Sequence, residues 1–217
     1  IEAWVYTDSS NEQIITSGRP SGESWIFLNK MSSSNTIRIL ISTDGSSWAV
    51  NSTSTETMTL SRWNHISVSR DGSTINMYLN GRLIISTSIS GSIHYNTSQK
   101  IAIGSGQNDS ADRTWNGYIS DFRIINGTAV VPPVNGPNEA LTEVTNTKLL
   151  TCRPSGASIT DLSTTGTTHT ITSISSTAAT YASPFGKAMH FDGTGDRATA
   201  TGVPDLGDDF TIECWVY

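Results

Sequence analysis

The stretch WNHISVSRDGSTINMYLNGRLIIS, residues 63–86, decides the fold of this chain. Asp-Gly at 71–72 and Asn-Gly at 80–81 divide it into three segments, and both dipeptides tolerate the positive φ of tight hairpin turns. In the middle segment, residues 75–79, apolar and polar side chains alternate, which is typical of a strand with one buried face. The stretch therefore predicts a three-strand antiparallel meander whose apolar face must be covered by a second sheet.

The rest of the chain also has the composition of a β-protein. Only 15% of its 217 residues are charged and 35% are hydrophobic, while Gly occurs 18 times. Thr suits a pleated surface, and Ser, Asn and Gly supply the turns between short strands. Further strands are expected at residues 13–18, 24–29, 36–42, 100–103, 117–125, 148–152, 187–191, 196–200 and 210–217. We predict an all-β fold in which two antiparallel sheets pack as a jelly-roll β-sandwich.

The first and last predicted strands repeat each other. IEAWVY at residues 1–6 returns as IECWVY at residues 212–217, an offset of 211 residues. Both copies alternate apolar and polar side chains, and we expect Glu2 and Glu213 to face solvent. We interpret the recurrence as a tandem repeat and expect the chain to be cut from a longer repetitive protein at equivalent points. The alternative is a short strand motif that recurs by chance within one domain.

The two cysteines, Cys152 and Cys214, are too few for a disulfide framework. Cys214 occupies the repeat position at which the first copy has Ala3, so this strand does not require a thiol. Either the two cysteines form a bridge or they remain buried free thiols, and we favour the free thiols.

The overall charge excludes some classes of partner. The formal net charge is −6 and the sequence pI is about 5.1, so no positive field attracts phosphate backbones and we expect no nucleic-acid binding. The sequence contains no run of about 18 apolar residues, so we expect no insertion into a membrane. Low charge with many hydroxyl groups is typical of extracellular and virion-surface proteins, and this is the expected location.

A Pro-rich segment divides the chain. Residues 132–147, PPVNGPNEALTEVTNT, contain three of the seven prolines and lack a strand period. The segment is predicted to be a linker between residues 1–131 and residues 148–217. The length of the chain suits one large sandwich or two small domains, so length alone does not decide this organisation.

Several motifs resemble laminin-G-like members of the concanavalin A-like lectin/glucanase superfamily. WNHISVSRDG…INMYLNG at residues 63–81 is similar to that family's W-x-H-[IV]-x-V-x-R-x-G…[LMI]-Y-[LV]-[ND]-G hairpin. GYISDFRIINGTAV at 117–130 resembles its closing strand, and FGKAMHFDGTGDRATA with DDFTIECWVY, within residues 185–217, resembles its opening half. The resemblance implies a circularly permuted order, in which residues 1–131 are the C-terminal two thirds of one sandwich and residues 148–217 the N-terminal third of the next.

The LLTC, FDGTGD and DFRI-x-x-GTAV patterns are similar to modules repeated in tailed-phage fibres, other virion proteins and bacterial surface adhesins. This resemblance implies a non-catalytic structural and adhesive repeat of an extracellular or virion-surface fibre protein. The expected partners are other copies of the same module. The two parts of the chain could close one permuted sandwich or complete neighbouring copies head to tail by strand exchange, and the sequence leaves both open.

The alternative of a glycoside hydrolase has little support. Glucanases of this superfamily have clustered catalytic carboxylates, and retaining hydrolysis needs two carboxyl groups about 5–5.5 Å apart. The sequence has no E-x-D-x-x-E run, and its four histidines are scattered without a metal-protease spacing. We therefore name no catalytic residue and expect His65 to pack within its strand signature.

Calcium is the cofactor that the resemblance implies. Family members often hold a structural Ca²⁺ between an early Asp loop and an Asp of the closing strand, which here are Asp161 and Asp121. Asp192 and Asp196, in DGTGD, form a second oxygen-rich turn, and Ca²⁺ prefers such hard oxygen ligands. The alternative is ordinary turn chemistry, in which each Asp caps its own backbone.

Carbohydrate binding is the second functional alternative, with a cell-surface glycan as partner and calcium assisting. It needs an exposed aromatic platform beside polar side chains, and Trp115 lies in a polar loop of the sequence. The neighbouring candidates are Asn108, Asp109, Asp112 and Arg113. The competing interpretation is that the Trp115 ring covers the edge of the sandwich.

Overall fold

A computed structural model describes residues 2–18, 26–95, 100–106, 113–153, 159–174, 177–179, 185, 188–202 and 210–216. These described residues form sixteen strands and no helix, so the all-β prediction is confirmed. It follows that none of them belongs to a helix able to span a membrane.

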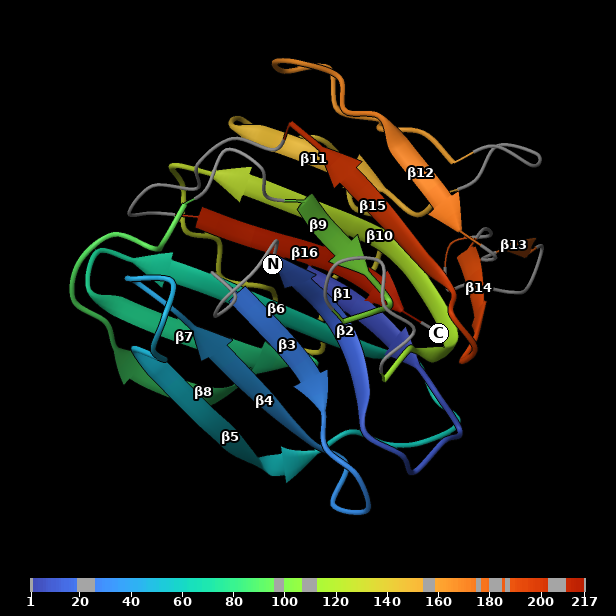
Figure 1. Cartoon of the computed structure of the whole chain (residues 1–217), viewed down its shortest axis with the longest axis horizontal. Helices are drawn as coiled ribbons and strands as arrows, with labels where there is room; N and C mark the ends of the chain where they lie inside the picture. The colour runs from blue at the N-terminus through green and yellow to red at the C-terminus, as the bar shows by residue number, and fades with distance from the viewer. Residues whose placement is uncertain are drawn as a thin grey trace.

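The larger sheet has nine strands among the described residues, all paired antiparallel (Figure 1). Its main path is β13 (Thr177–Ala179), β14 (Ala188–Asp192), β10 (Asn116–Asn126), β1 (Glu2–Tyr6), β6 (Asn64–Asp71), β7 (Thr74–Leu79) and β8 (Arg82–Ser88). Two further strands lie off this path. They are β11 (Thr147–Thr151), which pairs with β10, and β16 (Phe210–Val216), which pairs with β10 and β6.

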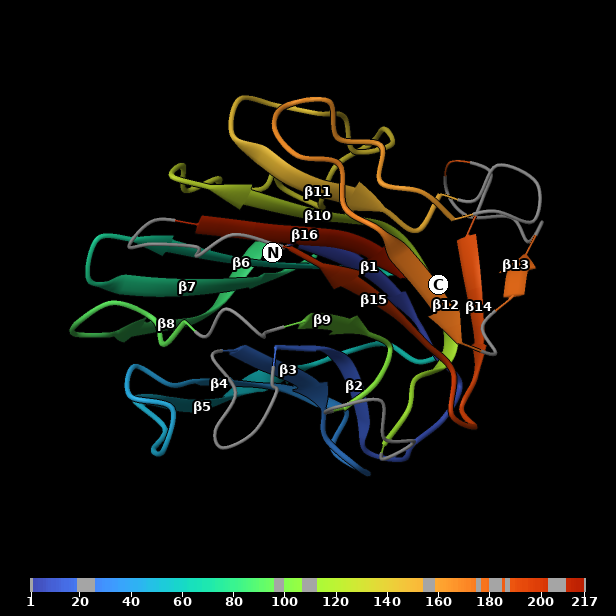
Figure 2. The ribbon, with the colours of Figure 1, turned by 45° about the horizontal axis from the view of Figure 1, so that its top comes forward.

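The smaller sheet has seven described strands and faces the larger one, so that the two form stacked layers (Figure 2). Its order is β12 (Ile171–Ile174), β15 (Arg197–Thr201), β9 (Lys100–Ile103), β2 (Gln13–Gly18), β3 (Ile26–Lys30), β4 (Thr36–Ile41) and β5 (Val50–Thr57). Strands from both sides of the predicted linker enter each sheet. The two parts of the chain thus close one sandwich, while the proposed domain boundaries stay a prediction.

The meander predicted from residues 63–86 is confirmed as β6, β7 and β8. Val68 pairs with Met77, and Met77 pairs with Ile85 across the next turn. Gly72 and Gly81 have φ of +55° and +75°, as the two turns require.

The apolar faces of the two sheets meet in a single core. Val68 and Met77 of the larger sheet are fully buried, as are Leu28 and Ile39 of the smaller sheet. Burial of such a side chain contributes about 1.5–3 kcal/mol, so this core is the main source of stability.

Two strands share one position in the larger sheet, which we call the β6–β10 slot. Both β1 and β16 pair with β6 on one side and with β10 on the other (Figures 1 and 2). Equivalent residues of the two strands meet the same partners: Ile66 pairs with Ala3 and Cys214, Asn64 with Val5 and Val216, and Ser120 with Trp4 and Trp215. The two copies of the hexapeptide are therefore equivalent in register as well as in sequence.

Two glycines with nearly the same backbone conformation test how tightly the core is packed. Gly104 and Gly91 have φ of +76° and +79°, but a Cβ on Gly104 would lie 2.5 Å from Cε1 of Phe191, whereas a Cβ on Gly91 would meet nothing within 4 Å. We expect Gly91→Ala to lower the free energy of unfolding by about 1–2 kcal/mol through left-handed strain. Gly104→Ala should lower it by about 1–3 kcal/mol more through overpacking. Urea denaturation measures both, and equal losses would contradict the packing argument.

Candidate functional site

The β6–β10 slot contains a buried charged cluster of three residues, Glu2 of β1, His65 of β6 and Arg123 of β10. Oε2 of Glu2 lies 3.3 Å from Nε2 of His65 and 3.6 Å from Nη2 of Arg123. The three side chains are 1%, 0% and 7% exposed, in that order. The expectation that Glu2 faces solvent is therefore wrong, because its strand lies between two others and its carboxylate faces the buried side chains of His65 and Arg123.

Burial lowers the pKa values of two members of the cluster, His65 and Arg123. Burial lowers the pKa of His65, and the nearby Glu2 carboxylate only partly opposes that shift. Burial also lowers the pKa of Arg123, again against the opposing effect of Glu2. The Trp4 ring lies beside His65, with ring centroids 5.3 Å apart, so the slot strand supplies both a carboxylate and an aromatic contact.

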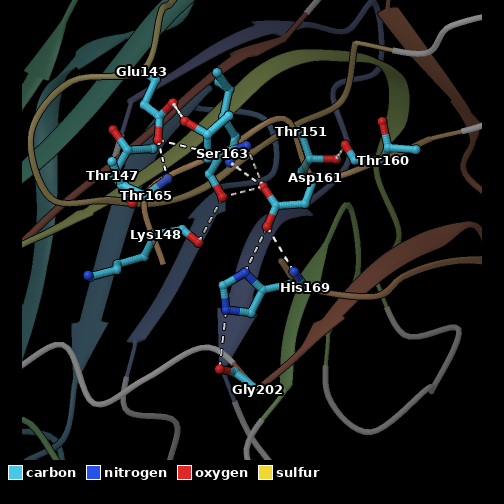
Figure 3. Close-up of polar contacts among 12 residues, drawn as sticks. Glu143, Thr147, Lys148, Thr151, Thr160, Asp161, Ser163, Thr165, His169 and Gly202 are labelled. Atoms are coloured by element: carbon cyan, nitrogen blue, oxygen red, sulfur yellow. Dashed lines mark hydrogen bonds and ion pairs between the residues drawn. The ribbon is translucent and has the colours of Figure 1, made fainter. Parts of the chain in front are cut away.

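Asp161, the first predicted calcium ligand, is the centre of a hydrogen-bond network (Figure 3). Its Oδ1 accepts hydrogen bonds from the backbone N–H of Leu150 at 3.2 Å and from N–H and Oγ of Ser163 at 2.9 and 2.7 Å. Its Oδ2 accepts from the backbone N–H of His169 at 3.0 Å and lies 2.8 Å from His169 Nδ1. Burial alone would raise the pKa of Asp161, but the hydrogen bonds from His169 and Ser163 outweigh it and lower that pKa. Both oxygens are thus committed to protein donors, which does not fit a metal ligand.

His169 completes this network through both nitrogens of its ring. Its Nε2 lies 3.2 Å from the carbonyl oxygen of Gly202, and its Nδ1 faces the Asp161 carboxylate. His169 therefore links the Asp161 carboxylate to the main chain at Gly202.

Glu143 binds Thr164 and Thr165, which lie in the same loop after β11 as Asp161 and Ser163. Its carboxylate accepts hydrogen bonds from N–H and Oγ1 of Thr164 at 2.8 and 2.6 Å and from N–H of Thr165 at 2.6 Å. These hydrogen bonds, that from the Thr164 hydroxyl foremost, lower the pKa of Glu143 to about 2. Together with Asp161, Glu143 fixes the loop after β11 onto the sheet.

Asp121, the second predicted calcium ligand, interrupts β10 with a φ of +54°. Its carboxylate accepts a hydrogen bond from Ser120 Oγ at 2.9 Å and forms an ion pair with Nε of Arg153. Burial raises the pKa of Asp121 to about 6, and Arg153 opposes that shift. Because its charge is matched by an arginine, Asp121 does not fit the calcium role with Asp161.

The turn that contains Asp192 and Asp196 differs from Asp161 and Asp121, the other two predicted calcium ligands. Backbone N–H of Asp192 donates to Oδ2 of Asp196 at 2.7 Å, and Thr194 N–H donates to Oδ1 of Asp192 at 2.7 Å. Asp196 is 2% exposed, and its Oδ1 has no hydrogen-bond partner among the described residues. Burial raises the pKa of Asp196. The described part of the chain contains no cluster of three or more His, Cys, Asp or Glu that could hold a metal, so other ligands would have to be main-chain, amide or hydroxyl oxygens.

Trp115, the predicted glycan platform, is fully buried in the core. Its Nε1 donates a hydrogen bond to the carbonyl oxygen of Tyr6 at 3.2 Å. The prediction of a stacking surface at Trp115 is therefore wrong, because neither face of the ring is accessible. Arg113 is exposed and forms an ion pair with Glu12 at 3.1 Å. Three further candidates, Asn108, Asp109 and Asp112, lie outside the described residues.

Of the two cysteines, Cys152 has a described side chain. It is a buried free thiol, in line with the favoured alternative. Burial raises the pKa of this thiol, so it stays protonated at neutral pH and is a poor nucleophile.

Comparison with models of protein families identifies a relationship over more than half of the chain. Residues 1–132 match a laminin G family model described as concanavalin A-like lectin/glucanases superfamily. Searches of the curated proteins and of the solved structures found no match to the chain.

The buried His65 predicts a pH dependence of stability. Unfolded His65 takes up a proton near its ordinary pKa of 6.5, whereas the folded residue does so only at lower pH. The contribution of His65 to the free energy of unfolding is therefore present above pH 6.5 and is lost as the pH falls below 6.5. The stability advantage of the wild type over His65→Gln should shrink between about pH 7 and 5, by up to about 1.4 kcal/mol per pH unit.

Urea unfolding at several pH values measures this difference. The half-buried His94 lies outside the cluster, and His94→Gln is the matched control. A wild-type advantage over His65→Gln that stays constant across this range would contradict the burial argument.

Proposed function

We propose, because the chain belongs to the concanavalin A-like lectin/glucanase superfamily, that it is a non-catalytic structural and adhesive repeat of an extracellular or virion-surface fibre protein. The superfamily fits a lectin-like or adhesive module. The fibre role and the location are the more specific part of this proposal.

The observation that carries the proposal is the shared register of β1 and β16. A short motif can recur by chance, but chance recurrence does not require the same two neighbouring strands and the same residue pairs. Both copies meet Ile66, Asn64 and Ser120 at equivalent positions. This supports a structural unit that recurs every 211 residues, as expected of a fibre built from repeats.

The chemistry of the charged groups also supports a structural role. Asp161 and Glu143 are used to fix a loop, and Glu2 neutralises buried Arg123. A carboxylate committed in this way is not available as a nucleophile or general acid.

A rearranged chain tests the repeat directly. Residues 148–217 joined to residues 7–131 contain every described strand except β1 and the first residue of β11, and therefore one slot strand instead of two. We expect this chain to give a β-rich circular dichroism spectrum, a cooperative unfolding transition and a monomer in sedimentation, because one slot strand completes the sandwich.

The matched control joins residues 148–209 to residues 7–131, which also removes β16. It should lose cooperative unfolding because the slot is then empty. A rearranged chain that stays unfolded while the original order folds would contradict the repeat.

Calcium-assisted carbohydrate binding is a second candidate, and the Asp192–Asp196 turn favours it. Asp196 has a buried carboxylate oxygen without a hydrogen-bond partner among the described residues, beside a second carboxylate. Oγ1 of Thr114 donates to the carbonyl oxygen of Gly193, so this turn contacts the residue that precedes the buried Trp115. Asp192 and Asp196 would hold a Ca²⁺ ion together with main-chain oxygens, and the ion would neutralise the pair.

Calcium should therefore stabilise the folded chain. Extracellular modules bind calcium with dissociation constants of about 10⁻⁴–10⁻³ M, and a concentration of about 100 times that constant adds about 2.7 kcal/mol to the free energy of unfolding. We expect a higher melting temperature in calcium than in chelator or magnesium. In Asp196→Asn the melting temperature should be the same in calcium and in chelator. Asp161→Asn should lower the melting temperature in both conditions but keep the increase that calcium gives. Equal melting temperatures in calcium and chelator would exclude this second candidate.

A further inference from the structure

The hairpin of β3 and β4 in the smaller sheet contains a fully buried lysine (Figure 1). Lys30 is the last residue of β3, and residues 31–35 form the loop that leads into β4. Nζ of Lys30 lies 3.2 Å from Oδ1 of Asn35 and 3.4 Å from the carbonyl oxygen of Met31. Both of these oxygens belong to neutral amide groups, so the contacts do not neutralise a charged amine. Burial among them therefore disfavours the charged form of Lys30.

Burial also makes Lys30 a reactive amine. It lowers the pKa of Lys30 to about 8, and the charge of Glu12 only partly opposes this shift. Glu12 is held in place, because its carboxylate accepts hydrogen bonds from Nδ2 of Asn29 at 2.8 Å and from Nη1 of Arg113 at 3.1 Å. At pH 8 about half of the Lys30 amine is therefore uncharged. A desolvated, uncharged lysine is a nucleophile.

The loop holds the side-chain amide of Asn35 beside this amine. N–H of Met31 donates to the carbonyl oxygen of Thr36 at 2.8 Å, which closes the hairpin. N–H of Met58 donates to the carbonyl oxygen of Asn35 at 2.8 Å, which fixes the loop to the chain that follows β5. Two reacting groups that a fold holds in contact behave as if each were present at a very high concentration.

We propose that Lys30 and Asn35 form an intramolecular amide cross-link. Nζ of uncharged Lys30 attacks Cγ of Asn35, the bond between Cγ and Nδ2 breaks, and one proton passes from Nζ to Nδ2, which leaves as ammonia. The products are one amide and one ammonia, so the reaction requires no oxidant, cofactor or partner. The inference goes beyond the proposed function and does not depend on it.

The cross-link removes a charge from the interior and closes the hairpin covalently. A buried amine that has become an amide no longer has a charge to desolvate. A covalent closure also reduces the conformational freedom of the unfolded chain, as a disulfide does. Because β3 pairs with β2 and β4, and β4 with β5, the cross-link stabilises one half of the smaller sheet.

Mass spectrometry of the whole chain tests the cross-link. After incubation of the folded chain at about pH 8, its mass should be lower than that of its sequence by one ammonia molecule. Trypsin should not cut after Lys30, because an acylated lysine has no charge for trypsin to recognise. Fragmentation of the resulting peptide should release no ions from within residues 30–35, since the cross-link joins the two ends of that segment. A chain kept unfolded in urea should retain its full mass.

The rate of ammonia loss should depend on pH. Only the uncharged amine attacks, so the rate should rise about tenfold per pH unit below about pH 8 and level off above that value. Samples withdrawn at intervals and quenched in acid measure this rate.

Two variants remove the two reacting groups separately. Lys30→Arg keeps a positive charge but has no nucleophilic amine at neutral pH. Asn35→Gly has no side-chain amide and tolerates the φ of +53° at this position, so it serves even if Lys30→Arg does not fold. Both variants should retain their full mass. Lys148→Arg is the matched control that should still lose ammonia, because Lys148 lies on β11 of the larger sheet.

An Asn-Gly sequence, such as residues 80–81, can also release ammonia by forming a succinimide, but trypsin would then still cut after Lys30. A wild-type chain that keeps its full mass after folded incubation would overturn the proposal. Ammonia loss that persists in Asn35→Gly, with trypsin cutting after Lys30 in the wild type, would overturn it equally.

Discussion

The contact of the Glu2 carboxylate with His65 and Arg123 is the interaction on which the larger sheet depends. His65 lies on β6 and Arg123 on β10, and both side chains are buried where a strand must pass between them. Removing one partner of a buried ion pair typically costs about 3–5 kcal/mol, because the remaining charge stays desolvated. A strand with an acidic residue in this register therefore stabilises the middle of the sheet by more than its backbone pairing alone.

The slot lies between two groups of strands, so the strand in it connects these groups into one sheet. On one side, β6 carries the β6–β7–β8 meander and its buried Val68 and Met77. On the other side, β10 carries β11 and β14, which come from the far part of the sequence. The slot strand hydrogen-bonds to both groups, so it joins the two parts of the chain into one sheet. The smaller sheet is continuous across the same two parts through the pairing of β9 with β15.

The sequence predicted the features that depend on local chemistry and missed those that depend on distant partners. Asp-Gly at 71–72 and Asn-Gly at 80–81 encode their turns directly, so the meander was predictable. The Ser- and Thr-rich β5, NSTSTET after Val50, has little apolar alternation and was not expected as a strand. Glu2 was expected to face solvent because alternation within one strand cannot reveal a sheet buried on both faces. Trp115 has polar neighbours in sequence, yet its ring packs against residues far along the chain.

The two copies of the slot strand differ at one position, which is Ala3 in β1 and Cys214 in β16. Ala3 and Cys214 both pair with Ile66 in register. Glu and Trp are identical in the two copies, and Glu2 and Trp4 are the residues of β1 that contact His65. Had the repeat been retained only to continue a hydrogen-bonded ladder, any β-forming residue would have served at these positions, since backbone pairing does not depend on the side chain. Two of the five identical residues, Glu2 and Trp4 of β1, instead neutralise and cover buried polar groups. The side chains of the slot strand, and not its backbone alone, therefore match the two strands on either side of it.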